Sequence, residues 1–296
     1  GSQFVIPVYQ RNYTWKANEQ VNQYLLDLEN VLKGNYKNHF LGIIIYLEKS
    51  LDFSTRELSV IDGQQRLTTT FLIIYAIKKM FENKGEVDRV NQLEGQFLTN
   101  PYATDKVKYK LKPLVSDDDV YRCIVENRFD EIIDQDSNIY KNYEYIYDKL
   151  QEWIDCGFDL NSILMALDKL YIVCVPISEE DNAQKIFESI NATGAKLTAA
   201  DLIRNFLLMD IQSDLQDIYY RDYWKKLEDY VSKDSKELEM FFRMVLAIKT
   251  YRLVSKNSVY REFMDWVECN DYKHNIANLF EELLDYAKTY DFIYKN

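Results

Sequence analysis

The stretch that decides the fold is LSVIDGQQRLTTT, residues 58–70. Its opening LSVI is compact and mostly apolar, which predicts a buried strand. The Asp-Gly pair that follows predicts a tight turn, and the apolar run over 67–81 predicts a helix. A strand that passes through a glycine turn into a helix presents the helix N-terminus, which favours an anion.

Side chains around this turn are of the kinds that bind phosphate. Arg66 supplies a fork of N–H donors suited to phosphate oxygens. Gln64 and Gln65 can donate to phosphate or orient a water molecule. Asp62 can hold Mg²⁺ or accept a proton. The stretch has no Gly-Lys-Thr of a Walker A loop, and an Asp-Gly turn whose Thr68 caps the helix is the structural alternative.

Two other stretches carry similar groups. IPVYQRNYTW, residues 6–15, places one arginine among amides and aromatics after a strand. The structural alternative for this stretch is a loop whose Tyr13 and Trp15 side chains fill the core. FESINATGAKLTAADLIRN, residues 187–205, reads as a helix, a glycine turn and a second helix, with a capping box from Thr198 to Asp201. An ordinary helical corner is the alternative here, since acidic surroundings count against DNA reading by a helix–turn–helix.

The charge of the chain is unevenly distributed. The 296 residues include 36 Lys and Arg and 48 Asp and Glu, a formal net charge of −12. Residues 1–113 contain 15 basic and 12 acidic residues, and residues 114–296 contain 21 and 36. The acidic balance therefore argues against nucleic acid only for the later two thirds. The first third can face a phosphate-rich ligand.

Composition excludes several classes of protein. The apolar run over 40–47 is far shorter than the ~20 residues that span a bilayer, and no signal segment opens the chain. Four widely spaced cysteines without CxxC fit the reducing cytosol. With only His39 and His274, a zinc site or a histidine-centred triad has little material.

Hydrophobic patterning and the small number of Gly (8) and Pro (4) predict an α+β fold that is predominantly helical. We expect strands at 4–9, 40–47, 57–61, 106–112 and 170–176. We expect helices at about 18–33, 67–81, 117–127, 140–153, 162–167, 182–190, 199–209, 219–231, 238–251, 259–267 and 276–290. The expected division is a 1–113 α/β core and a mainly helical 114–296, with strand 170–176 returning to the core sheet.

The strand expected at 106–112 has a face made of lysines, which are Lys106, Lys108, Lys110 and Lys112. Neighbours on one face of a strand lie ~6.6 Å apart, close to the phosphate spacing of a nucleic-acid strand. This pattern predicts a DNA-binding surface. The alternative is an edge strand whose lysines prevent aggregation.

The three polar stretches, in this order, resemble the N-terminal domain of the GmrSD family of modification-dependent (type IV) restriction proteins. Its marks are Ile-Pro-x-Tyr-Gln-Arg-x-Tyr-x-Trp, Asp-Gly-Gln-Gln-Arg-Leu-Thr-Thr and Asn-x-Thr-Gly followed by Asp-Leu-Ile-Arg-Asn, all within residues 4–205. The family is similar in fold to ParB and sulfiredoxin. The resemblance therefore implies a small mixed sheet with flanking helices, extended by a helical region.

The resemblance also implies binding and hydrolysis of a nucleoside triphosphate with Mg²⁺. It assigns catalytic roles to Asp62, Gln64, Gln65 and Arg66, with Asp62 as the metal ligand. It assigns nucleotide-binding roles to Gln10, Arg11, Gly63, Thr68, Thr69, Asn191, Thr193, Gly194 and Arg204. The function it implies is a sensor module that controls a nuclease. A non-hydrolysing module that binds nucleotide or modified DNA is the alternative.

Family members commonly carry a C-terminal HNH-type nuclease domain, which needs a histidine base and metal ligands. His274 lies in the sequence DYKHN, residues 271–275, without a recognisable nuclease pattern. We therefore expect no nuclease activity from this chain alone. The expected partners are a nucleoside triphosphate, modified DNA and a nuclease domain or subunit, in the cytoplasm and without a membrane. A homodimer is left open.

Overall fold

The computed structural model describes residues 1–50, 55–103, 107–178, 181, 183–191, 197–232 and 234–294. The chain forms two compact units. Unit 1 consists of Gly1–Pro7 and Asn12–Ala183, and unit 2 of Val8–Arg11 and Gln184–Asn296. The predicted fold class is confirmed, since the described residues are predominantly helical and include a small mixed sheet.

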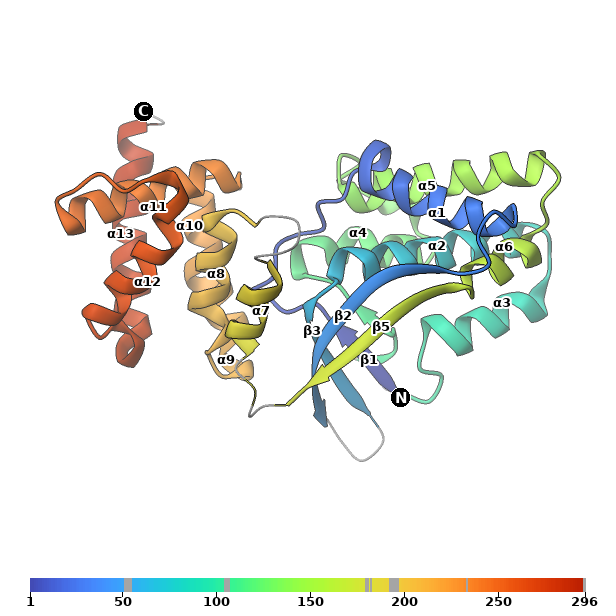
Figure 1. Cartoon of the computed structure of the whole chain (residues 1–296), viewed down its shortest axis with the longest axis horizontal. Helices are drawn as coiled ribbons and strands as arrows, with labels where there is room; N and C mark the ends of the chain where they lie inside the picture. Colours follow the sequence, from blue (N-terminus) through green and yellow to red (C-terminus); the bar gives the residue numbers. More distant parts are fainter. Residues whose placement is uncertain are drawn as a thin grey trace. The chain divides into compact units, whose positions relative to one another are not determined.

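The sheet of unit 1 has the strand order β4-β1-β3-β2-β5. Figure 1 labels β1, β2, β3 and β5 of this sheet. Its strands are β1 (Ser2–Val5), β2 (His39–Ser50), β3 (Arg56–Asp62), β4 (Leu111–Lys112) and β5 (Leu170–Ile177). β3 is antiparallel to β2 and parallel to β1, while β4 and β5 extend the sheet in parallel beside β1 and β2. β3 is therefore central, and its residues 58–61 are buried. Because residues 58–61 are held in the core, the end of the strand at Asp62 has a defined position.

Helix α2 (Gln64–Asn83) follows β3 directly and is the central helix of unit 1. Apolar side chains on all of its sides are buried, as expected for a helix without a polar face. α5 (Asn138–Asp155) packs against α2 through a buried stripe, and both lie with α1 on one side of the sheet (Figure 1). The other helical elements of unit 1 are η1 (Ala17–Val21), α1 (Asn22–Leu32), α3 (Val87–Leu93), η2 (Glu94–Leu98), α4 (Val115–Val125), η4 (Phe129–Glu131) and α6 (Leu160–Leu167).

Unit 2 is helical in all the elements described for it. They are α7 (Ala183–Asn191), α8 (Ala199–Met209), α9 (Ser213–Tyr219), η5 (Tyr220–Trp224), α10 (Lys225–Tyr230), α11 (Ser235–Thr250), η6 (Lys256–Ser258), α12 (Val259–Cys269), η7 (Tyr272–Asn275) and α13 (Ile276–Tyr294). Its core is aromatic, with Trp224 stacked on Phe242 and Phe263 against both Phe242 and Trp266. Among the described helices of the whole chain, none is long and apolar enough to cross a membrane.

The division of the chain differs from the boundary expected at residue 113. α4, α5 and α6 follow that residue in sequence, yet they pack inside unit 1, with α5 on α2 and α6 on α1. β5 pairs along β2 from Leu170 opposite His39 to Ile177 opposite Leu47. The change to an acidic composition at residue 113 therefore falls inside unit 1, and the chain passes to unit 2 after Ala183.

Candidate functional site

The predicted turn between strand and helix is formed by Gly63. β3 ends at Asp62, Gly63 has a left-handed φ of +91°, and α2 begins at Gln64. A Cβ on Gly63 would lie 2.8 Å from the backbone oxygen of Ile43, so only glycine fits both the φ and the space. The first helical hydrogen bond runs from the Leu67 N–H to the Gly63 oxygen, and the amides before it mark the positive end of the helix.

The helix therefore starts three residues earlier than the predicted 67–81. The capping role considered for Thr68 is wrong, because Gly63 occupies the N-cap position. Thr68 lies in the second turn and is buried, as is Thr69. The first turn consists instead of Gln64, Gln65 and Arg66, which places all three predicted side chains at the helix N-terminus.

Arg66 turns its guanidinium toward β2. Nη1 donates to the backbone oxygen of Ile43, and Nη2 lies 3.9 Å from Oδ2 of Asp62. Both side chains stay partly exposed, Arg66 at 28% and Asp62 at 24%. Because a guanidinium has five N–H donors, Arg66 keeps donors for an anion at the surface.

Gly42 is a site residue that the sequence analysis did not assign. Its φ is +124°, and it lies at a register shift where β2 pairs with β5. A Cβ there would lie 2.7 Å from Nη1 of Arg66, so the glycine makes room for the guanidinium. The signal was present, because an isolated glycine inside a strand pattern indicates a bulge or a close approach.

Gln65 uses its amide within the protein. Oε1 accepts from the backbone N–H groups of Thr14 (2.9 Å) and Trp15 (3.1 Å), and Nε2 donates to the backbone oxygen of Asn12 (3.1 Å). The side chain is only 7% exposed. Gln65 therefore orders the loop at residues 12–15, within the polar stretch 6–15. Its predicted action on a phosphate stays a prediction.

The same loop is tied down from three more directions inside unit 1. The Tyr13 N–H donates to Asp117, and the Tyr13 hydroxyl lies 2.7 Å from Oγ1 of Thr69. Asn138 donates to the Tyr13 oxygen and Asn142 to the Trp15 oxygen. Burial raises the pKa of the Tyr13 phenol, so it stays neutral. These contacts agree with the alternative in which Tyr13 fills the core.

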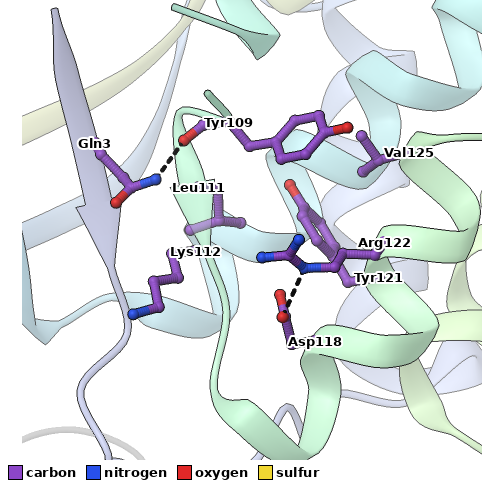
Figure 2. A pocket seen from close by; sticks show the side chains of 8 residues that line it. All are labelled: Gln3, Tyr109, Leu111, Lys112, Asp118, Tyr121, Arg122 and Val125. Carbon is purple, nitrogen blue, oxygen red and sulfur yellow. Dashed lines mark hydrogen bonds and ion pairs between the residues drawn. The ribbon is translucent and has the colours of Figure 1, made fainter. Parts of the chain in front are cut away.

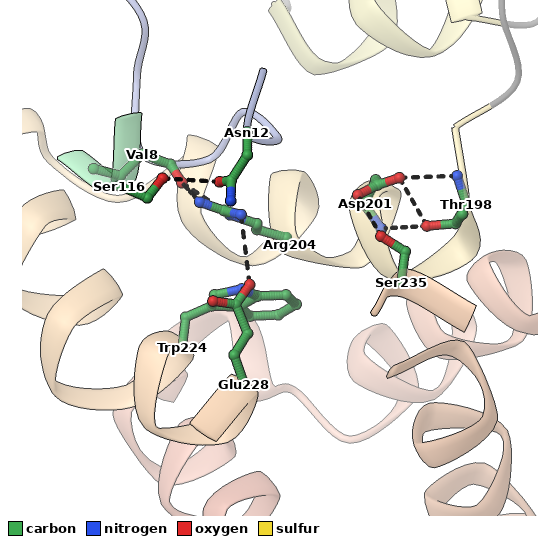
Figure 3. A network of polar contacts seen from close by, with 9 residues as sticks. All are labelled: Val8, Asn12, Ser116, Thr198, Asp201, Arg204, Trp224, Glu228 and Ser235. Carbon is green, nitrogen blue, oxygen red and sulfur yellow. Dashed lines mark hydrogen bonds and ion pairs between the residues drawn. The ribbon is translucent and has the colours of Figure 1, made fainter. Parts of the chain in front are cut away.

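The remaining predicted nucleotide-binding residues with described surroundings belong to unit 2. Gln10 is buried and Arg11 half-buried, both in the segment Val8–Arg11. Arg204 is 5% exposed and donates to the Val8 backbone oxygen from Nε (2.9 Å) and Nη2 (2.6 Å). Figure 3 shows this guanidinium between the Val8 carbonyl and Glu228, whose Oε1 lies 3.6 Å from Nη1.

The capping box predicted within the polar stretch 187–205 is confirmed, at the start of α8. Thr198 Oγ1 accepts from the Asp201 N–H (3.2 Å), and Asp201 accepts in return from the Thr198 N–H (3.1 Å) (Figure 3). Asn191 is the last residue of α7. Thr193 and Gly194 lie outside the described residues, so their predicted roles stay predictions.

The lysine strand expected at 106–112 is wrong in extent, because only Leu111–Lys112 is a strand among 107–112. Asn100 binds this segment instead: its N–H donates to the Lys108 oxygen and its side chain to the Val107 oxygen. Lys106 lies outside the described residues. Lys108 and Lys112 are exposed, but Lys110 donates from Nζ to the Gln96 oxygen at 2.7 Å, and burial lowers its pKa.

A small cavity beside β4 does not offer a ligand site. It is lined by Gln3, Tyr109, Leu111, Lys112, Asp118, Tyr121, Arg122 and Val125 (Figure 2). Its volume is about 10 Å³, room for a single water molecule. Nε2 of Gln3 donates to the backbone oxygen of Tyr109 at 2.8 Å, and Nε of Arg122 donates to Oδ2 of Asp118 at 2.7 Å. The cavity belongs to the packing of the sheet edge.

Within the described ranges, no three or more His, Cys, Asp or Glu side chains gather so that they could hold a metal ion. His274 lies 2.6 Å from Asp271 in an exposed turn.

The protein family follows from a comparison with known proteins. Residues 1–208 match the model of the GmrSD restriction endonuclease N-terminal domain. This match covers more than half of the chain, and the chain belongs to that family. It is also 23% identical, over 229 residues, to an uncharacterized protein of Methanocaldococcus jannaschii. The alignment covers 67% of this chain and 38% of that relative, so the chain spans well under half of the relative's length.

Proposed function

We propose that this chain is the nucleoside-triphosphate-binding and hydrolysing sensor of a modification-dependent DNA restriction system. It controls a nuclease that another domain or subunit supplies. Family membership supports a role in a restriction system, since the family consists of N-terminal domains of restriction endonucleases. The observation that carries the nucleotide proposal is the partly exposed guanidinium of Arg66 at the N-terminus of α2.

Three features support binding of a phosphate at this point. The positive end of α2 attracts an anion, and its first turn follows a glycine that keeps side-chain atoms away from the backbone. Arg66 adds charge-assisted hydrogen bonds, which are stronger than neutral ones. β2 and β3 hold both groups, because Ile43 receives Nη1 of Arg66 and Gly63 packs on the same backbone oxygen.

The residues present fit Mg²⁺ that arrives with the nucleotide. Mg²⁺ is usually held by one or two carboxylates together with waters and substrate phosphates, and Asp62 provides one carboxylate at the strand end. When bound there, Mg²⁺ offsets negative charge on the phosphate oxygens. In our proposal Gln64 orients the attacking water and Arg66 holds the γ-phosphate. The products are a nucleoside diphosphate and inorganic phosphate.

A module that binds nucleotide without turnover is the second candidate. The observation in its favour is Gln65, one of four residues predicted to be catalytic, whose amide is engaged by three backbone groups. In that case nucleotide, or the DNA modification, acts as an effector. Binding and hydrolysis must therefore be measured separately.

The decisive experiment measures phosphate release and equilibrium binding for ATP, GTP, CTP and UTP with Mg²⁺, with and without modified DNA. The Arg66→Ala variant should lose both signals. Arg56→Ala is the matched control, because Arg56 is exposed on β3, the strand that precedes α2, and pairs with Glu48 at the surface. Binding without release would favour the second candidate. Failure of all four nucleotides to bind would overturn the hydrolysing sensor and the nucleotide-binding form of the second candidate.

The nuclease and the oligomeric state are tested with the same protein. The chain alone should leave modified and unmodified plasmid uncut in Mg²⁺ and each nucleotide. Reproducible nicking that disappears in Arg66→Ala would overturn the assignment of cleavage to another domain or subunit. Sedimentation equilibrium, with and without nucleotide, decides between monomer and homodimer.

A further inference from the structure

An open pocket of about 350 Å³ lies on unit 1, away from the residues assigned to the nucleotide. One face of α5 forms most of it, with Lys79 of α2 and Phe129 of η4 at its side. The lining residues from α5 are spaced three and four apart, so they share one face of the helix. They are Tyr140, Tyr143, Glu144, Tyr147 and Asp148.

Aromatic rings make up the apolar part of this pocket. The ring of Tyr143 lies 5.5 Å from that of Phe129 and 6.4 Å from that of Tyr147, with interplanar angles of 31° and 37°. Tyr143 is buried and fixed in the wall, whereas Phe129 and Tyr147 are half-buried. Asn83 donates to the Tyr147 hydroxyl at 3.0 Å, which holds that ring in place.

The structure already places one ammonium group on these rings. Nζ of Lys79 lies 5.9 Å from the centroid of Phe129, within the range of a cation–π contact. Lys79 also pairs with Glu82 at 3.6 Å, and Glu82 is shared with Lys78 at 3.3 Å. The position of Lys79 shows that an aromatic ring of this pocket faces a cation.

The lining charge that remains is negative. Glu144 and Asp148 are exposed at the pocket and form no ion pair within 4.0 Å among the residues that the structure describes. The Tyr140 hydroxyl donates to Glu144 at 2.7 Å, which fixes that carboxylate at the rim. Two carboxylates beside aromatic faces attract a cation and repel a phosphate.

We propose that this pocket binds an organic ammonium ion of the quaternary type, with its methyl groups against the tyrosine rings and its charge beside the two carboxylates. Aromatic faces suit such ions because a quaternary ammonium cannot donate hydrogen bonds and is held by ring electrons and by charge. The pocket volume is within the usual range for small-molecule sites. This site is independent of the nucleotide proposal.

The test compares choline with 3,3-dimethyl-1-butanol, which has the same shape without the charge. Isothermal titration and saturation-transfer NMR should show saturable choline binding, with the neutral analogue at least about tenfold weaker. Equal binding of the two would mean an apolar groove without charge recognition. Absence of saturable choline binding to the wild-type chain would overturn the proposal outright.

Variants locate the binding. Glu144→Gln combined with Asp148→Asn should weaken choline about tenfold or more, and so should Tyr147→Leu. Asp155→Asn is the matched control, because Asp155 lies on the same helix outside the pocket and should leave affinity unchanged. Choline affinity that is equal in all of these proteins would place the binding elsewhere and refute the assignment.

Discussion

Arg204 of α8 donates from two nitrogens to the backbone oxygen of Val8, which lies 196 positions earlier in the chain. The guanidinium also lies 4.9 Å from the ring centroid of Tyr220 and 6.0 Å from that of Trp224. Pro7 and Asn12 belong to unit 1, whereas the four residues between them, Val8–Arg11, belong to unit 2. The contact with Arg204 holds this N-terminal segment within unit 2. The predicted nucleotide residues Gln10 and Arg11 are in that segment, and Arg204 acts on their position through Val8.

Replacing Arg204 with alanine should destabilise unit 2. The change leaves the Val8 oxygen and the mostly buried Glu228 carboxylate without the guanidinium, and breaking a buried pair costs about 3–5 kcal/mol. Arg204→Lys keeps the charge but not the two-nitrogen contact, and should fall between alanine and wild type. The free energy of unfolding, from denaturant titration, measures both.

Arg221→Ala is the control for Arg204, because Arg221 pairs with Asp222 at the surface. It should leave the free energy of unfolding almost unchanged. If Arg204→Ala were as stable as this control but had lost nucleotide affinity, Arg204 would be a ligand of the nucleotide rather than a structural residue.

The Arg66→Ala variant should behave in the opposite way. Arg66 and Asp62 are both partly exposed and 3.9 Å apart, so their ion pair contributes at most about 1 kcal/mol to stability. A lost charged contact with phosphate costs about 1.5–3 kcal/mol of binding, roughly tenfold to over a hundredfold in affinity. Thermal unfolding with and without nucleotide separates the two effects. A variant that melts far below wild type without nucleotide would show that the DGQQR box is structural.

Much of the fold was predictable, because it rests on local patterns. The helix predicted at 140–153 lies within α5, and the strand predicted at 170–176 is β5. The start of α2 was missed because the polar residues 64–66 carry no hydrophobic periodicity, and the left-handed Gly63 allows the helix to begin there. The lysine strand failed because the pattern could not show that Asn100 would bind its backbone.

The candidate site was predictable in its residue types and not in its contacts. Asp62 and Arg66 stand at the strand end and helix start, as the motif indicated. The hydrogen bonds of Gln65 depend on residues 12–15, which lie fifty or more positions away in the chain. No local sequence pattern encodes those partners. The relation of Gly42 to Arg66 likewise depends on tertiary packing of β2 against the helix start.

Gln65→Leu should loosen the loop that Gln65 holds. Two N–H groups and one oxygen lose their partner, and each buried group left unpaired costs about 1–3 kcal/mol. Amide hydrogen exchange should therefore accelerate at Thr14 and Trp15. Gln92→Leu, at an exposed position of α3, is the control and should leave those two amides unchanged. Equal exchange in both variants would show that the loop is held by its other contacts.

If the lysine segment binds DNA, Lys108 and Lys110 should contribute differently to the DNA affinity. Lys108 is exposed, whereas the Lys110 ammonium already donates to the Gln96 oxygen. If the segment contacts phosphates, Lys108→Glu should lower the log–log salt slope of DNA affinity by about one unit. The double change with Lys110→Glu should weaken binding further. Affinity titrated at several salt concentrations measures the slope, and an unchanged slope would favour the edge-strand interpretation.

Gly42→Ala should impair nucleotide binding although it replaces none of the predicted ligands. The new Cβ would lie 2.7 Å from Nη1 of Arg66 and would displace the guanidinium, while the φ of +124° adds strain of about 1–3 kcal/mol. Gly157→Ala isolates the strain, because Gly157 has a φ of +99° and nothing within 4 Å of its Cβ position. Both variants should lose stability, but only Gly42→Ala should lose nucleotide affinity, measured by titration well below each melting temperature. Equal affinities in the two variants would mean that the guanidinium position set by Gly42 does not matter for binding.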